Sequence, residues 1–135
     1  MSFQAVTEPD IDTLIGDLRD DNGRVRQKAC RALSKMGSSA AAALVTMLGD
    51  ENGAARAGAT NALLMMRDAA DDAVPALIEA LACDNSDIPD RASWTLSLMG
   101  EAARPALFDA LDDIRASVRK HAEAALTRMK AAATR

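Results

Sequence analysis

The side chains that most often carry out chemistry in proteins are few in this sequence and lie far apart. The chain has one histidine, His121, and two cysteines, Cys30 and Cys83, none of them in a C-x-x-C or paired-histidine spacing. A metal ion needs several converging ligands, and a reactive thiol needs a nearby base or a second cysteine. No glycine-rich phosphate loop, nucleophile elbow or Ser/His/Asp set is visible. We therefore expect no enzyme activity, no metal and no cofactor, and we expect His121 to be a solvated helix residue.

Length and charge exclude further classes of protein. The chain has 135 residues, which suits a single domain over 1–135. Its formal net charge of −4 argues against a dedicated nucleic-acid binder and against attachment to an anionic membrane surface. No apolar run reaches the roughly 18–20 residues of a membrane span, and the first ten residues show no signal-peptide pattern. Because two isolated cysteines make no disulfide framework, we expect a cytoplasmic protein.

The composition predicts helices rather than strands. Hydrophobic residues make up 49% of the chain but aromatic residues only 2%, so Ala, Leu, Val, Ile and Met must fill the core. Ala, Leu and Met are good helix formers, whereas the β-branched and aromatic residues typical of strands are scarce. We predict an all-α domain.

A sequence pattern that returns four times predicts how these helices are arranged. Each copy contains a methionine at the same place, and these methionines are 30, 33 and 30 residues apart, at 36, 66, 99 and 129. In the first copy the apolar residues follow the i, i+4, i+7, i+8, i+11 spacing of one helix face. They are Val25, Ala29, Ala32, Leu33 and Met36. Repetition at this length is typical of solenoids, in which each repeat packs on its neighbours.

A second helical pattern lies between the copies. It reads Leu-x-x-x-Leu at 44–48, 77–81 and 107–111, and 14–18 fits the same frame. We therefore expect about seven to eight helices in antiparallel pairs. The expected units are a half-repeat over 11–18, repeats over about 20–48, 50–81 and 84–111, and a C-terminal half-repeat over 113–130.

Glycines and prolines mark the ends of these elements. Gly37 and Gly100 directly follow the methionine of their copies, as glycines that end helices do. Pro75 and Pro105 are expected near the start of second helices, where the missing N–H of proline costs least. The middle repeat carries three extra residues near Asp68–Asp72, which we place between its two helices.

The repeat resembles a known motif. The pattern Asp-x-x-x-x-Val-Arg-x-x-Ala-x-x-Ala-Leu-x-x-Met-Gly is similar to HEAT repeats, specifically the short type named after phycobilisome lyases. The resemblance covers about residues 11–130, and the third copy departs from it where Pro89 replaces the arginine. The first copy carries the motif on Asp20, Val25, Arg26, Ala29, Ala32, Leu33, Met36 and Gly37, and the last on Asp113, Val118, Arg119, Ala122, Ala125, Leu126 and Met129.

The resemblance implies a right-handed α-α superhelix, that is, a HEAT-like solenoid, and it is specific for fold rather than for function. Among proteins with this fold, the deoxyhypusine hydroxylases hold iron on paired His-Glu motifs, which a chain with one histidine cannot supply. Phycobilisome lyases grip a large conjugated pigment, which favours an aromatic-lined groove, and this chain has one Trp and two Phe. We therefore expect a non-catalytic protein-interaction scaffold instead of either enzyme.

Arginine and aspartate recur together in three copies. We expect each aspartate to cap the helix that follows it, and each arginine to pair with that aspartate or with a neighbouring turn. A ligand-binding ladder is the alternative. The residues are Arg26, Arg56, Arg119, Asp20, Asp50 and Asp113.

Candidate binding residues lie at outward positions of the second helices. In a HEAT-type stack these helices line a concave face, and extended concave surfaces are what solenoids use for binding. We expect a protein partner there, a basic or amphipathic segment that meets the mildly acidic lining. The outward candidates are Asp17, Thr46, Met47, Glu79, Ala80, Asp109 and Ala110.

Trp94 is a further candidate. It stands where the other copies have Arg31, Asn61 and Ala124, about 140° from the apolar stripe of an ideal helix. An outward tryptophan can anchor a partner, since tryptophan is enriched at binding hot spots. Equally, Trp94 can pack against a neighbouring repeat or against the insertion at 68–72.

Charge is unevenly spread and leaves two further functions open. Residues 19–36 contain six basic and two acidic residues, and residues 68–90 contain seven acidic and no basic ones. Basic ends and an acidic middle can guide a partner or a second copy of the chain. One alternative to a scaffold is a nucleic-acid module like the HEAT-like DNA glycosylases. The other is self-association through the terminal half-repeats, with Phe3 and Val6 as part of a cap.

Overall fold

A computed structural model describes residues 9–66, 70–83 and 87–134, and these residues form eight α-helices and a short 3-10 helix at Gly100–Ala102, with no strand. The predicted all-α fold is thereby confirmed. The expected cap at Phe3 and Val6 lies outside the described residues. The elements are α1 (Ile11–Asp17), α2 (Gly23–Lys35), α3 (Ser38–Met47), α4 (Gly53–Met65), α5 (Ala70–Ala80), α6 (Asp87–Met99), η2 (Gly100–Ala102), α7 (Arg104–Ala110) and α8 (Ala116–Ala133).

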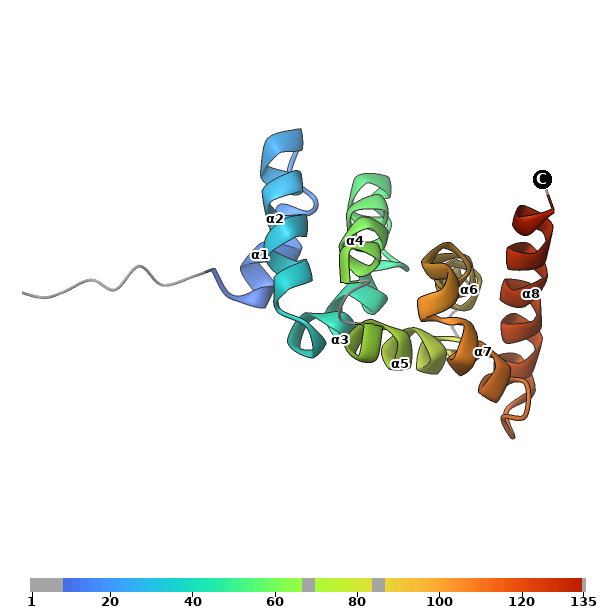
Figure 1. The fold of residues 1–135 in the computed structure, drawn as a ribbon. Coiled ribbons are helices and arrows are strands. Elements are labelled where there is room, and N and C mark those ends of the chain that lie inside the picture. The colour runs from blue at the N-terminus through green and yellow to red at the C-terminus, as the bar shows by residue number, and fades with distance from the viewer. Residues whose placement is uncertain (1–8, 67–69, 84–86, 135) are drawn as a thin grey trace, which may run out of the picture.

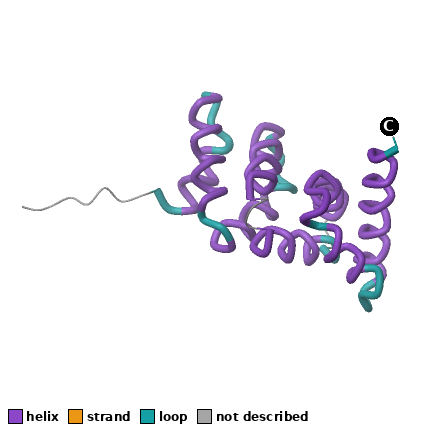
Figure 2. Tube along the Cα trace, in the orientation of Figure 1, coloured by secondary structure: helices purple, strands orange, loops and turns teal. Residues whose placement is uncertain are grey.

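The helices form two layers that can be followed along the chain in Figure 1 and Figure 2. In the first-helix layer, α2, α4, α6 and α8 each contact the next helix of the series. In the second-helix layer, α1, α3, α5 and α7 do the same. The layers are joined where α1 contacts α2, α3 contacts α4, α5 contacts α6 and α7 contacts α8. The molecule is therefore a helical-repeat solenoid, as the sequence predicts.

Leucine and alanine fill the space between the layers. Leucines directly after three of the second helices are fully buried, and alanines of the first helices let neighbouring backbones approach closely. Truncating one such leucine to alanine typically costs about 2–5 kcal/mol. The buried leucines include Leu18, Leu48 and Leu81, and the alanines include Ala29, Ala59, Ala92 and Ala122.

Asparagine and glycine define where the first helices begin and end. Asn22 and Asn52 are the N-caps of α2 and α4, and their side chains accept the main-chain N–H two residues later at 2.9 Å. Gly37 follows α2 with φ 60° and ψ −136°, and Gly100 follows α6 with φ 62°. Side chains other than hydrogen disfavour this backbone region, so glycine ends both helices as predicted.

One expectation about α5 is wrong. The helix begins at Ala70, so residues 70–72 of the insertion near 68–72 belong to α5, while residues 67–69 lie outside the described range. Pro75 consequently lies inside α5 and not near its start. Alanine and aspartate suit a first helical turn, which explains the early start. Pro105 stands in the first turn of α7, as predicted.

Candidate functional site

Three arginines occupy the same place beside three turns. In each, Nη1 donates to two consecutive main-chain carbonyl oxygens of the turn, at 2.7 Å and at 2.9 or 3.0 Å. Main-chain oxygens thus hold each guanidinium in place. This supports a structural role, rather than ligand binding, for the recurring arginines. The bonds run from Arg26 to Asp20 and Asp21, from Arg56 to Asp50 and Glu51, and from Arg119 to Asp113 and Ile114.

The aspartates of these turns do not cap helices, contrary to expectation. Each carboxylate accepts the main-chain N–H of the residue two positions later, at 2.8 to 3.0 Å. An aspartate placed before the N-cap residue closes a local turn of this kind, because its short side chain reaches only the nearest N–H groups. The bonds run from Asn22 to Asp20, from Asn52 to Asp50 and from Arg115 to Asp113.

The acidic candidates meet at a hollow between α5 and α7, which we call the α5/α7 hollow. Its volume is about 370 Å³. Apolar side chains from both helices line it, including Val74, Ile78 and Ala106. Its three carboxylates belong to Glu79, Asp109 and Asp113.

One arginine pairs with two of these carboxylates. Arg115 donates to Glu79 at 2.8 and 3.0 Å and to Asp113 at 2.9 and 3.0 Å. These hydrogen bonds lower the pKa of Asp113 to about 2 and also lower the pKa of Glu79, while the two carboxylates raise the pKa of Arg115. Asp109 is exposed and has no ion-pair partner among the described residues.

Two other concave-face candidates are at least partly accessible. Thr46 is exposed on α3, and its hydroxyl donates to the carbonyl oxygen of Ala42 at 3.1 Å. Asp17 is half-buried at the end of α1. The structure does not bring Asp17 or Thr46 into the α5/α7 hollow, because neither residue lines it.

Three candidates expected to face outward are buried instead. Met47 has only 4% of its surface exposed, and Ala80 and Ala110 at the equivalent places have 6% and 4%. Each stands three residues after a buried leucine of its own helix, and i, i+3 neighbours share a helix face. The predicted outward placement of these residues is therefore wrong.

Trp94 lies on α6 at its junction with α8, and 53% of its surface is exposed. The guanidinium carbon of Arg128 lies 5.5 Å from the ring centroid, a cation–π contact that covers part of the ring. Arg128 also donates to the hydroxyl of Ser93 at 3.0 Å, and Ser93 donates to the carbonyl oxygen of His121 at 2.9 Å. Trp94 thus packs against the neighbouring repeat and still offers about half of its surface.

His121 fills this same junction, so the expectation of a solvated helix residue is wrong. Its side chain is 15% exposed. Nδ1 lies 2.8 Å from the carbonyl oxygen of Ser117, and Nε2 lies 3.2 Å from Asp90 Oδ1. Across the described ranges, no group of three or more His, Cys, Asp or Glu residues could hold a metal ion.

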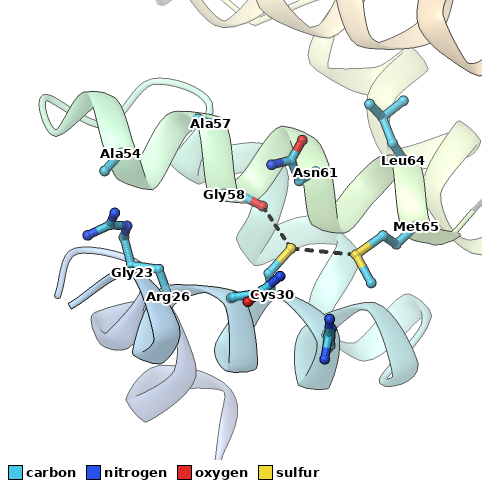
Figure 3. Close-up of a pocket in the computed structure, with 11 residues that line it drawn as sticks. Gly23, Arg26, Cys30, Ala54, Ala57, Gly58, Asn61, Leu64 and Met65 are labelled. Atoms are coloured by element: carbon cyan, nitrogen blue, oxygen red, sulfur yellow. Dashed lines mark hydrogen bonds between the residues drawn. The ribbon is translucent and has the colours of Figure 1, made fainter. Parts of the chain in front are cut away.

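Sequence reasoning missed a groove between α2 and α4, shown in Figure 3. This α2/α4 groove has a volume of about 890 Å³. The Cys30 thiol on its wall lies 3.5 Å from the carbonyl oxygen of Gly58 and 3.7 Å from Met65 Sδ. Burial raises the pKa of this thiol, which makes it a poor nucleophile. One sequence feature could have indicated this groove: the small residue Gly58 stands where the next two copies have the large residues Arg91 and His121.

Residues 11–97, more than half of the chain, match the family model for HEAT repeats. The chain is a HEAT-repeat protein. The predicted resemblance is thereby confirmed at the level of the family. A comparison of this HEAT-repeat chain with curated proteins gives no match. The part that the structure describes contains no helix long and apolar enough to cross a membrane.

Two solved structures are similar to this HEAT-repeat protein. One is the crystal structure of an engineered protein of the Northeast Structural Genomics Consortium, with 21% identity, a TM-score of 0.39, and 90% of this chain aligned to 62% of that one. The other is a designed armadillo repeat protein in complex with the peptide (KR)4, with 20% identity, a TM-score of 0.36, and 88% aligned to 64%. The chain thus spans less than two thirds of either. At TM-scores this low the likeness says nothing of function.

Proposed function

We propose that this HEAT-repeat protein is a non-catalytic scaffold that docks a basic or amphipathic protein segment on its second-helix layer, which we take as the concave face. The observation that carries the proposal is the α5/α7 hollow, where the exposed carboxylate of Asp109 has no ion-pair partner among the described residues. Ile78 and Ala106 supply apolar surface beside it. A segment with one basic and one apolar face fits both features.

Charge and apolar burial have different tasks in this docking. An exposed carboxylate such as Asp109 steers a basic segment and helps to select it, while contributing less to affinity. Affinity comes from the apolar area that the segment covers. Arg115 stays with Glu79 and Asp113, so the rim keeps its shape while Asp109 meets the partner.

Further properties follow from the residues as part of the same proposal. The two free cysteines, Cys30 and Cys83, support a cytoplasmic location, where thiols stay reduced. The spacing of the repeat supports the short phycobilisome-lyase type of HEAT repeat, here without lyase activity and without a cofactor. We assign the stack to one repeat domain, with the units over 20–48, 50–81 and 84–111 between two half-repeats.

A peptide array tests the proposal. The full chain is labelled and applied to amphipathic peptides, each present in a lysine, a glutamine and a glutamate version of one apolar pattern. We expect the lysine versions to bind best, and Asp109→Lys to weaken that binding about tenfold through charge repulsion. Glu123→Lys is the matched control, because Glu123 is an exposed carboxylate on α8 outside the hollow. Equal binding of all three versions, or of Asp109→Lys and the native chain, contradicts the proposal.

A second candidate function, self-association, is favoured by two exposed apolar side chains. Ile114 is 93% exposed in the turn before α8, where the equivalent residues of earlier turns are Asp21 and Glu51. Phe108 on α7 is 53% exposed. We expect concentration-dependent association in sedimentation velocity that Ile114→Glu reduces; a monomer over the whole concentration range removes this candidate.

A further inference from the structure

The α2/α4 groove is open because this junction lacks the side chains that fill the equivalent places of the next two. From α6, Arg91 Nη1 reaches the carbonyl oxygen of Leu48 at 2.8 Å. His121 occupies the corresponding place on α8 with its side chain 15% exposed. On α4 that place is Gly58, where an added Cβ would lie 3.1 Å from Leu18 Cδ2. Close packing on Leu18 therefore favours a small residue at position 58, and the space between α2 and α4 beside Gly58 stays unfilled.

Part of the groove lining is apolar and made of small or flexible residues. Ala54, Ala57 and Gly58 expose little more than backbone, so a bound chain can approach closely. Cys30 and Met65 place two sulfur atoms side by side, and Met65 is 49% exposed. Methionine adapts its shape to different apolar partners. This surface suits an aliphatic side chain.

The surroundings of the groove carry positive charge. α2 contains five arginines and lysines and α4 one, and neither helix contains a carboxylate, although the whole chain has a net charge of −4. Arg31 lines the groove, is exposed, and has no ion-pair partner within the described ranges. Gln27 and Asn61 line it too, and their amides can both donate to and accept from a peptide backbone.

We propose that the α2/α4 groove binds a short acidic segment of a protein partner. The carboxylates of the segment meet Arg31, and one aliphatic side chain rests on Cys30 and Met65. Each helix has 13 residues and is therefore about 20 Å long, which matches about six residues of extended chain. The acidic turns at 20–21 and 50–51, directly before the two helices, repel a long polyanion such as a nucleic acid, so a short segment fits better.

This site goes beyond the proposed function and does not depend on it. The groove lies in the first-helix layer and the α5/α7 hollow in the second-helix layer, and the two share no lining residue. Their charges are opposite. A failure of one proposal therefore leaves the other standing, and each site provides a control for the other.

Peptide binding to the full chain tests the groove. The probe is a fluorescein-labelled peptide in which glutamates flank one leucine, with glutamine and lysine versions as controls. Arg31→Glu removes the charge complementarity, and Ala57→Phe fills the groove from an exposed position that folding does not require to be small. Lys130→Glu and Ala131→Phe are matched controls on the exposed surface of α8. Fluorescence anisotropy gives the dissociation constants, and circular dichroism checks the helix content of each variant.

We expect the glutamate peptide to bind, and Arg31→Glu and Ala57→Phe each to weaken it about tenfold or more, while both controls and Asp109→Lys bind as the native chain does. Glutamine or lysine versions that bind equally well overturn the proposal. So does unchanged binding by Ala57→Phe. A single-stranded or duplex oligonucleotide that binds more tightly than the peptide, with the same dependence on Arg31 and Ala57, assigns the groove to nucleic acid and also overturns it.

Discussion

Asp113 joins the turn before α8 to the α5/α7 hollow. Its carboxylate accepts the main-chain N–H of Arg115 at 2.8 Å and the Arg115 side chain at 2.9 and 3.0 Å. The same guanidinium holds Glu79. Arg115 thus links the turn at Asp113 to the carboxylate of Glu79, some thirty residues earlier in the chain.

The charge of Asp113 predicts a pH dependence. Its pKa is lowered from 3.8 to about 2, chiefly by the Arg115 hydrogen bonds, so ionisation stabilises the folded state. This contribution is complete above pH 3.8 and is lost as the pH falls towards 2. We expect Asp113→Asn, which keeps the oxygen acceptor, to lower the urea midpoint at neutral pH and to match the native chain at about pH 2.

Asp112→Asn is the control for this experiment, because Asp112 is an exposed neighbour whose carboxylate has no ion-pair partner among the described residues. It should leave the urea midpoint unchanged at every pH. A difference between Asp113→Asn and the native chain that persists down to pH 2 would show that the substitution acts through packing and not through charge.

The turn between helices is the element that recurs most faithfully. Arginine closes it by bonding two carbonyl oxygens, and the aspartate at its start bonds the N–H two residues later. In α6 the equivalent of the turn arginine is Pro89, which is buried near the start of the helix. Proline fits a first helical turn but brings no guanidinium.

Removing one turn arginine should destabilise the stack. Arg56 is half-buried and donates to the carbonyl oxygens of Asp50 and Glu51. Hydrogen bonds from a charged donor contribute more than neutral ones, so we expect Arg56→Ala to lower the free energy of unfolding by about 1–3 kcal/mol in urea titrations. Arg24→Ala, at an exposed arginine that lines no turn, should cost less than about 0.5 kcal/mol. Equal losses would mean that the turn bonds contribute nothing.

Sequence periodicity predicted the helices and their stacking but not all of their boundaries or faces. The leucine and alanine positions were readable because burial repeats with the helix period. Met47 was misplaced because it shares a face with Leu44, three residues earlier, which a repeat alignment does not weigh. Pro75 was misplaced because a proline marks a helix start only when nothing upstream can extend the helix.

The solenoid as a whole carries two surfaces of opposite charge on its two layers. The sequence showed uneven charge, yet it could not place the α2/α4 groove, because the groove results from a missing side chain at Gly58 and from how α2 lies beside α4. The α5/α7 hollow was closer to prediction, since Glu79 and Asp109 both line it. The hydrogen bond from Arg115 to Glu79 at this hollow joins residues 36 positions apart in the chain, so no local sequence pattern reveals it.

Two separate surfaces predict simultaneous binding. We expect the native chain to hold a glutamate-rich and a lysine-rich amphipathic peptide at once, because the two sites share no residue. Two differently labelled peptides and fluorescence cross-correlation measure this directly, with a free mixture of the peptides as the control for their mutual attraction. Asp109→Lys should release only the lysine-rich peptide and Arg31→Glu only the other. Competition between the peptides for one copy of the chain would contradict the arrangement.

The hydrogen bonds from the turn arginines to main-chain oxygens also allow this chain to be used as a molecular ruler. Each arginine bonds main-chain oxygens, so the turn does not depend on the side chain at its second position. The chain places Asp21, Glu51 and Ile114 there on one backbone conformation. All three point into solvent. Dyes or cross-linkers attached through Asp21→Cys and Glu51→Cys would therefore sit at matched points of successive repeats, and the separation between them would report any bending of the stack when a partner binds.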